Sequence, residues 1–244
     1  MYKIRGEVVE DIQKIKEVND QAFGQENETR LIEAIRKSDS FIPELSLVAK
    51  TGDGDVIGHI LFSLISIETK DGEESVLALA PMAVKPDCQN KGVGSALVRV
   101  GLERCEAAGY RSVVVLGHPE FYPRFGFVRA STKGIRPPFE VPDAAFMVNE
   151  LVPGSLEGTK GTVQYPEAFS AASDDSAAFF RFMIRKDKKE NVNLTLMKHG
   201  AKNSSSTYLP KNNKSIISLR TIIVCLTTTS PQSIYIQNHS MKKR

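Results

Sequence analysis

The stretch that decides the fold is Met82-Ala83-Val84-Lys85-Pro86-Asp87-Cys88-Gln89-Asn90-Lys91-Gly92-Val93-Gly94-Ser95-Ala96-Leu97. An apolar strand runs into a short polar turn, the turn ends in two glycines, and a helix begins directly after it. The first turn of a helix has backbone N–H groups without intrahelical partners, and the peptide dipoles there favour negative charge. Because Gly92 and Gly94 carry no Cβ, an oxyanion can approach the main chain closely. The stretch therefore predicts a phosphate site, with Lys91 as a positive charge at its rim.

The spacing of the glycines argues against two other phosphate-binding motifs. A dinucleotide site has the pattern G-x-G-x-x-G, but Leu97 stands where the third glycine belongs. A Walker loop needs G-x-x-x-x-G-K-[ST], and the chain has no such run. A lone G-x-G is also compatible with a plain strand-to-helix turn, so the phosphate reading needs further support.

That support comes from a resemblance to a known family. The sequence Q-x-x-G-x-G after an apolar strand resembles the acetyl-CoA motif of the GCN5-related N-acetyltransferase (GNAT) superfamily. The whole run Leu79–Phe127 is similar to the YhbS-like branch, as are the segments Pro138–Pro142 and Ala145–Met147. The resemblance covers residues 1 to about 170. It implies an α/β fold, the GNAT (acyl-CoA N-acyltransferase) fold, with a mixed central sheet, two splayed strands and flanking helices.

Composition and charge divide the chain of 244 residues into a body and a tail. We expect an N-acetyltransferase domain over 1–170, a boundary segment over 171–184 and a basic tail of low order over 185–244. The tail has twelve basic and two acidic residues, a net charge of +10, which leaves −7 for the rest. Such a tail predicts disorder and at most weak, non-specific binding to nucleic acid, with few aromatic residues to stack bases.

Several observations bear on compartment and partners. The chain has no run of 18 apolar residues, and its first residues lack the apolar region of a secretory signal. Cys88, Cys105 and Cys225 are odd in number and lack metal-type spacing. We therefore expect a cytoplasmic protein with no metal and no membrane partner. The sequence leaves the oligomeric state open.

Hydrophobic periodicity predicts the order of elements in the body. Two amphipathic helices follow a short N-terminal strand, with Val8 and Ile12 on the inner face of the first and Asn27 as cap of the second. A meander of three strands comes next, then the glycine turn, a helix that ends at Gly109, a buried parallel strand and proline-rich loops. The expected strands are 2–5, 45–50, 56–67, 76–84, 113–116, 145–151 and 161–165.

Pro81 lies inside the strand that leads to the glycine turn. Because proline cannot donate to a strand ladder, it marks either an edge strand or a bulge. The resemblance implies the bulge, at a point where two neighbouring strands splay apart and the pantetheine arm inserts between them.

The resemblance also implies which main-chain groups hold acetyl-CoA. Those expected to contact the pyrophosphate belong to Gln89, Asn90, Lys91, Gly92, Val93, Gly94 and Ser95. Those expected to pair with pantetheine, with a local N–H facing the thioester oxygen, belong to Met82, Ala83 and Val84. Loss of one N–H that stabilises a developing oxyanion raises the activation barrier by roughly 3–4 kcal/mol.

Tyr122 is the candidate general acid that protonates the leaving thiolate. In the superfamily a tyrosine shortly before a Gly-Phe pair has this role, and Tyr122 precedes Gly126-Phe127. A phenol of pKa about 10 and a thiol of pKa about 8.5 can exchange a proton in either direction. The alternative is a packed aromatic residue with no chemical role.

The general base is left open by the sequence. His118 and Glu120 are candidates because they lie close to Tyr122, while Glu74, His59 or an ordered water are alternatives. His59, within an apolar strand, is more typical of a hydrogen-bonded core residue. Many relatives carry an asparagine about seven residues before the tyrosine, where this chain has Val115.

These observations predict an enzyme, an acetyl-CoA-dependent N-acetyltransferase. It would acetylate a primary amine by direct transfer in a ternary complex. The alternative is a non-catalytic CoA-binding sensor or scaffold. A covalent route through Cys88, whose thiol would need a low pKa beside the helix N-terminus, has no histidine or aspartate partner at a useful spacing. The acceptor amine has no sequence signature.

Overall fold

The computed structural model describes residues 1–172, so the predictions for the basic tail and for most of the boundary segment lie outside the described residues. The strands are β1 (Tyr2–Gly6), β2 (Phe41–Thr51), β3 (Val56–Thr69), β4 (Gly72–Val84), β5 (Ser112–Leu116), β6 (Val128–Arg129), β7 (Ile135–Arg136), β8 (Phe146–Glu150) and β9 (Gly161–Gln164). The helices are α1 (Ile12–Phe23), α2 (Asn27–Arg36) and α3 (Val93–Ala107). Short 3₁₀ turns are η1 (Val9–Asp11), η2 (Pro86–Cys88), η3 (Tyr122–Phe125), η4 (Ala130–Lys133), η5 (Asp143–Ala145) and η6 (Glu167–Ala172).

A mixed sheet forms the centre of the described part, in the order β1-β2-β3-β4-β5-β8-β6. Along this order neighbouring strands run antiparallel except β4 and β5, which α3 connects as a parallel pair, and β7 and β9 form a second parallel pair in the same sheet. Short β9 pairs with β3 at Ser66–Thr69, beyond the part of β3 that β2 covers, and β7 pairs with β9. This arrangement confirms the predicted α/β fold with a mixed sheet.

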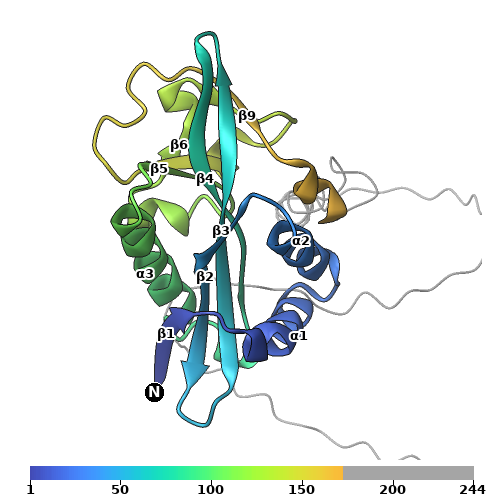
Figure 1. Ribbon diagram of the computed structural model, residues 1–244. Coiled ribbons are helices and arrows are strands. Elements are labelled where there is room, and N and C mark those ends of the chain that lie inside the picture. The colour runs from blue at the N-terminus through green and yellow to red at the C-terminus, as the bar shows by residue number, and fades with distance from the viewer. Residues whose placement is uncertain (173–244) are drawn as a thin grey trace, which may run out of the picture.

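Helices cover both faces of the sheet, with α3 on one side and α1 and α2 on the other (Figure 1). The apolar residues of α3, including Leu97 and Val98, pack against Leu47 and Phe62 in one core. Those of α1 and α2 pack against the alternate residues of the same strands in a second core. β5 contributes Val113 to the first and Val114 to the second, as expected for a strand buried on both faces.

Two glycines bring α3 close to the sheet. A Cβ on Gly101 would overlap the ring of Phe62 on β3. A Cβ on Gly58 would lie 2.9 Å from Leu97 and 3.2 Å from Val93, both on α3. The close approach fixes the N-terminus of α3 against the ends of β3 and β4.

The strands β4 and β5 separate in the middle of the sheet. Their pairing consists of Leu77 with Val113 and Ala78 with Val114, although β4 continues to Val84. On its other edge, β4 pairs Leu79 with Phe62 and Met82 with Ile60, so it holds one residue more than β3 over this interval. The bulge predicted at Pro81 is therefore confirmed, and the edge-strand alternative is wrong because β4 is central.

Three details differ from the sequence predictions. Val8 and Ile12 are exposed rather than inward-facing, because the chain turns through η1 before α1 begins. Asn27 is the first residue of α2, and Glu26 is at the cap position. The proline-rich region contains two-residue strands, β6 and β7. None of the helices within residues 1–172 combines the length and apolarity needed to cross a membrane.

Candidate active site

The glycine turn joins the end of β4 to the start of α3 through η2. Asn90 and Gly92 both have left-handed backbones, with φ of 58° and 82°. Gly92 is the N-cap of α3, a position where a left-handed backbone favours glycine. The side chain of Gln89 turns back and donates from Nε2 to the carbonyl oxygen of Val84 at 2.9 Å. This bond ties the turn to the strand end and gives the Gln89 side chain a structural role that the sequence did not reveal.

The main-chain amides of the turn are free of internal partners. Within residues 1–172, none of the seven N–H groups from Gln89 to Ser95 donates to a backbone or side-chain acceptor. The first N–H of α3 that donates is that of Ala96, to the carbonyl oxygen of Gly92. Lys91 is exposed beside them. A run of unpaired N–H groups at a helix N-terminus favours an anion with several oxygen atoms.

Around Gly94 the predicted cofactor-binding residues come together with the aromatic segment of η3. A Cβ built on Gly94 would lie 3.7 Å from both Met82 Cε and Val84 Cγ2, and 3.8 Å from Phe121 Cζ. The Phe121 ring in turn lies 5.0 Å from that of Tyr122 in an edge-on contact. The start of α3, the end of β4 and η3 therefore border one region, beside the gap between β4 and β5.

Tyr122 is buried and closely packed. Its ring contacts Phe127 at a centroid distance of 5.5 Å and lies against Gly117, the residue that follows β5. The η3 backbone is fixed by the Asn149 amide, which donates to the Phe125 carbonyl at 2.7 Å. The ring position of Tyr122 is thus set from three sides.

A cation lies at the same border. The Arg124 guanidinium is 4.5 Å from the centroid of Phe121, and its Nε donates to the Phe121 carbonyl at 3.0 Å. Arg99, on α3, lies 5.4 Å from the centroid of Phe125. Neither arginine carries a signal in the sequence, because contacts between α3 and η3 depend on the tertiary fold.

The base candidates have different environments. His118 and Glu120 are exposed on the turn between β5 and η3, and the His118 carbonyl accepts the Phe121 N–H at 3.0 Å. Glu74 is exposed near the β3–β4 hairpin, where it pairs with Ile67, away from the gap.

His59 is a core residue. It is fully buried, with Nε2 3.0 Å from Ser46 Oγ and Nδ1 3.4 Å from Asn19 Nδ2. Burial lowers the pKa of His59, against the neighbouring carboxylate of Glu7, and so favours the neutral ring. The core interpretation made from the sequence is confirmed.

Glu28, in the first turn of α2, is a buried carboxyl group. The residue is 1% exposed, and the Gln25 amide donates to its oxygens at 3.1 and 3.2 Å. Burial raises the pKa of Glu28 to about 7, against hydrogen bonds from its own N–H and from Gln25. A spacing pattern cannot reveal this, because residue 28 is buried by the way α2 packs.

A covalent route needs a cysteine thiol with a lowered pKa, but the pKa of Cys88 is raised. Burial and the adjacent Asp87 raise the pKa of its thiol, although the nearby lysines act in the other direction. The thiolate is therefore disfavoured, which argues against the acyl-cysteine route.

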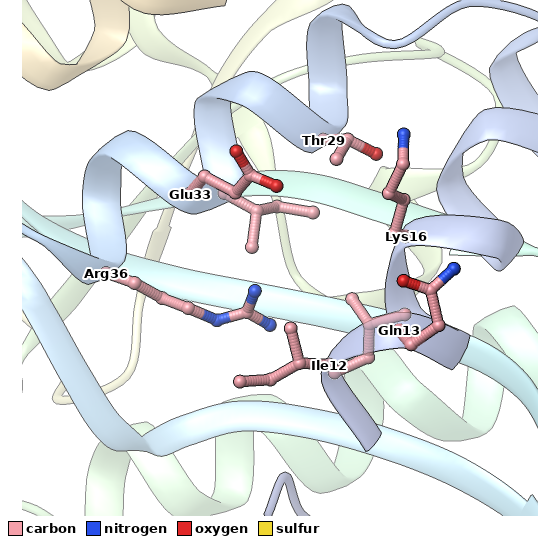
Figure 2. Close-up of a pocket in the computed structure, with 8 residues that line it drawn as sticks. Ile12, Gln13, Lys16, Thr29, Glu33 and Arg36 are labelled. Atoms are coloured by element: carbon pink, nitrogen blue, oxygen red, sulfur yellow. The ribbon is translucent and has the colours of Figure 1, made fainter. Parts of the chain in front are cut away.

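Two hollows lie near the α1–α2 side of the sheet. The first, between α1 and α2, has a volume of about 50 Å³, and Figure 2 shows Lys16 and Gln13 of α1 facing Thr29 and Arg36 of α2 across it. Arg36 is engaged there by Glu7 at 2.8 Å. The second hollow, of about 150 Å³, lies among η4, β7, η5 and the start of β8. The second has more room for a ligand.

Comparison with known proteins gives consistent similarities. The Acetyltransferase (GNAT) family model matches residues 11–127. The uncharacterized N-acetyltransferase YhbS of Escherichia coli K12 is 34% identical over 167 residues, which cover 68% of this chain and 98% of YhbS. YjhQ of the same organism, also named an uncharacterized N-acetyltransferase, is 37% identical over 61% of this chain and 84% of YjhQ.

Solved structures show the same similarity in three dimensions. The crystal structure of E. coli YhbS in complex with CoA has a TM-score of 0.65 at 31% identity, covering 69% of this chain and 92% of that one. A GNAT family acetyltransferase from Brucella melitensis, in complex with acetyl-CoA, has a TM-score of 0.57 at 31% identity, covering 69% and 98%.

Proposed function

Because the chain belongs to the acetyltransferase (GNAT) family, we propose that it moves the acetyl group of acetyl-CoA to a primary amine of a small molecule or protein. Transfer is direct, within a ternary complex of enzyme, acetyl-CoA and amine. The observation that carries the proposal is the run of unpaired amides from Gln89 to Ser95 beside the gap between β4 and β5. The complexes of YhbS with CoA and of the Brucella enzyme with acetyl-CoA support the same cosubstrate.

The amides at 89–95 are proposed to hold the diphosphate. Each N–H would donate to a phosphate oxygen, and the N-terminal end of the α3 dipole adds to the attraction. The exposed Lys91 contributes a positive charge. No internal hydrogen bond has to be broken for this contact, since these amides have no other acceptor within residues 1–172.

The open edge of β4 is proposed to hold the pantetheine arm. Beyond Ala78, β4 has no β5 partner, so the main chain of Met82, Ala83 and Val84 is available on that side for an extended ligand with amide groups. A local N–H of this segment would donate to the thioester oxygen as it becomes an oxyanion.

Tyr122 is proposed as the general acid. The amine nitrogen attacks the thioester carbonyl carbon, and the C–S bond breaks as the C–N bond is completed. Tyr122 gives its phenolic proton to the departing sulfur, and the amine loses a proton to a base or to water. The packing of Tyr122 beside Phe121, which borders Gly94 and the end of β4, supports this role.

The experiment that tests the function measures free thiol released from acetyl-CoA over a panel of primary amines, beside a thermal shift with acetyl-CoA. The expected result is a thermal shift together with amine-dependent thiol release. A thermal shift without thiol release on any amine would instead favour the non-catalytic sensor.

A further inference from the structure

The larger hollow adjoins the proposed reaction centre. Phe146, which lines it, pairs with Leu116, the last residue of β5. The carbonyl of the neighbouring Ala145 accepts a hydrogen bond from the N–H of Gly117 at 2.9 Å. Gly117 in turn packs against the ring of Tyr122. One wall of the hollow is therefore built on the strand end where β4 and β5 are already apart.

The hollow lies on the face of the sheet opposite α3. Its residues Ile135 and Phe146 belong to the core that includes α1 and α2, whereas Tyr122 and the start of α3 belong to the other core. Figure 1 shows these helices on the two sides of the sheet. A thioester that reaches between β4 and β5 from the α3 side would meet an amine that comes from the side of the hollow.

The lining combines an apolar wall with an unpartnered cation. The apolar residues are Ile135, Pro137, Val141 and Phe146, and the polar ones are Ser131, Arg136 and Asp143. Asp143 is paired with Arg129 at 3.5 Å. Arg136 is exposed, and within residues 1–172 its guanidinium has no ion pair or hydrogen bond. A guanidinium presents a planar fork that matches a carboxylate.

We propose that this hollow seats the acceptor and that the acceptor is a small amino carboxylate, its carboxylate on Arg136 and its apolar portion against Phe146 and Val141. This inference rests on the proposed acetyl transfer. The volume of about 150 Å³ equals roughly five water molecules at about 30 Å³ each. That room suits one amino-acid side chain. Aliphatic α-amino acids such as leucine and methionine fit these requirements.

Matched pairs of acceptors test the proposal. Thiol release from acetyl-CoA is measured with leucine and leucinamide, and with methionine and methioninamide, which differ in the carboxylate. The wild type is expected to favour the free carboxylates by about tenfold in kcat/KM. Arg136→Gln should raise KM for the carboxylates about tenfold, with kcat and the KM of the amides nearly unchanged.

Arg111→Gln is the matched control, since Arg111 is exposed at the start of β5 and does not line the hollow. It should keep the preference for carboxylates. Equal rates with the amides, or a preference that survives Arg136→Gln, would overturn the inference and leave acetyl transfer standing. Absence of thiol release with every amine would overturn the proposed function and this inference with it.

Discussion

The ring of Tyr122 lies directly against the α-carbon of Gly117, so that a Cβ at residue 117 would come within 2.9 Å of Cδ2 and closer still to Cε2. Gly117 has no left-handed backbone, so the tyrosine, and not the turn, requires a glycine there. The two residues form one unit at the end of β5.

Gly117→Ala should therefore impair turnover by displacing Tyr122. We expect kcat to fall about tenfold or more, with a loss of stability of about 1–3 kcal/mol from overpacking. The affinity for acetyl-CoA, measured by calorimetry, should stay nearly unchanged. Gly52→Ala is the control, because a Cβ there meets nothing within 4 Å. Full kcat in Gly117→Ala would show that the Tyr122 position is irrelevant to the reaction.

Tyr122→Phe removes the proposed proton donor and keeps the aromatic packing with Phe121 and Phe127. Because general acid help contributes about 10²–10⁴ in rate, kcat should fall by about a hundredfold. Steady-state kinetics and the dissociation constant for acetyl-CoA separate this effect from lost binding. Unaltered turnover would remove Tyr122 from the mechanism.

Gly92→Ala should weaken acetyl-CoA binding. The left-handed backbone of Gly92, with φ of 82°, would be strained by a Cβ, and the amides of the turn would shift. Gly109 lies just past the other end of α3 with a similar φ of 89° and open space, so Gly109→Ala carries the same backbone strain. We expect the dissociation constant to rise about tenfold in Gly92→Ala and to stay nearly unchanged in Gly109→Ala. An equal effect in both variants would indicate general destabilisation.

Glu28 predicts a pH-dependent stability. Its pKa is raised from an ordinary 4.5 to about 7 by burial, so the folded state holds this proton more tightly than the unfolded state does. The contribution of Glu28 to the free energy of unfolding is complete at a pH below its pKa in the unfolded state. It is lost as the pH rises through its pKa in the folded state. Glu28→Gln imitates the protonated form, so it should stabilise the fold at pH 8 by about 2 kcal/mol more than at pH 5.

Urea unfolding of wild type and Glu28→Gln at the two pH values measures this difference. Glu33→Gln, on an exposed part of α2, serves as the control. A Glu28→Gln effect that is the same at both pH values would contradict the burial argument.

The sequence predicted the elements whose residues carry a strong local signal. The two glycines after an apolar strand predicted the start of α3, and Pro81 inside a strand indicated the bulge. In contrast, β6 and β7 are too short to show any hydrophobic periodicity in the sequence. They form only because β6 pairs with β8 and β7 pairs with β9. Val8 and Ile12 fit a helical spacing, but the η1 turn rotates them out to solvent.

The candidate site likewise has some residues that the sequence predicted and others that only the fold reveals. The glycine turn and Tyr122 could be found from motifs, whereas the contact of Tyr122 with Gly117 and the stacking of Arg124 on Phe121 depend on how the chain folds back. The burial of Glu28 and the hollow beside Arg136 depend equally on tertiary packing.

The most direct test of the account is titration calorimetry of the chain with acetyl-CoA and, in parallel, with acetyl-pantetheine, which lacks the diphosphate. If the amides of residues 89–95 hold the diphosphate, acetyl-CoA binds saturably at one site and acetyl-pantetheine binds about a hundredfold more weakly or not at all. Equal affinity for the two ligands, or no heat with acetyl-CoA on folded protein, would contradict the central claim.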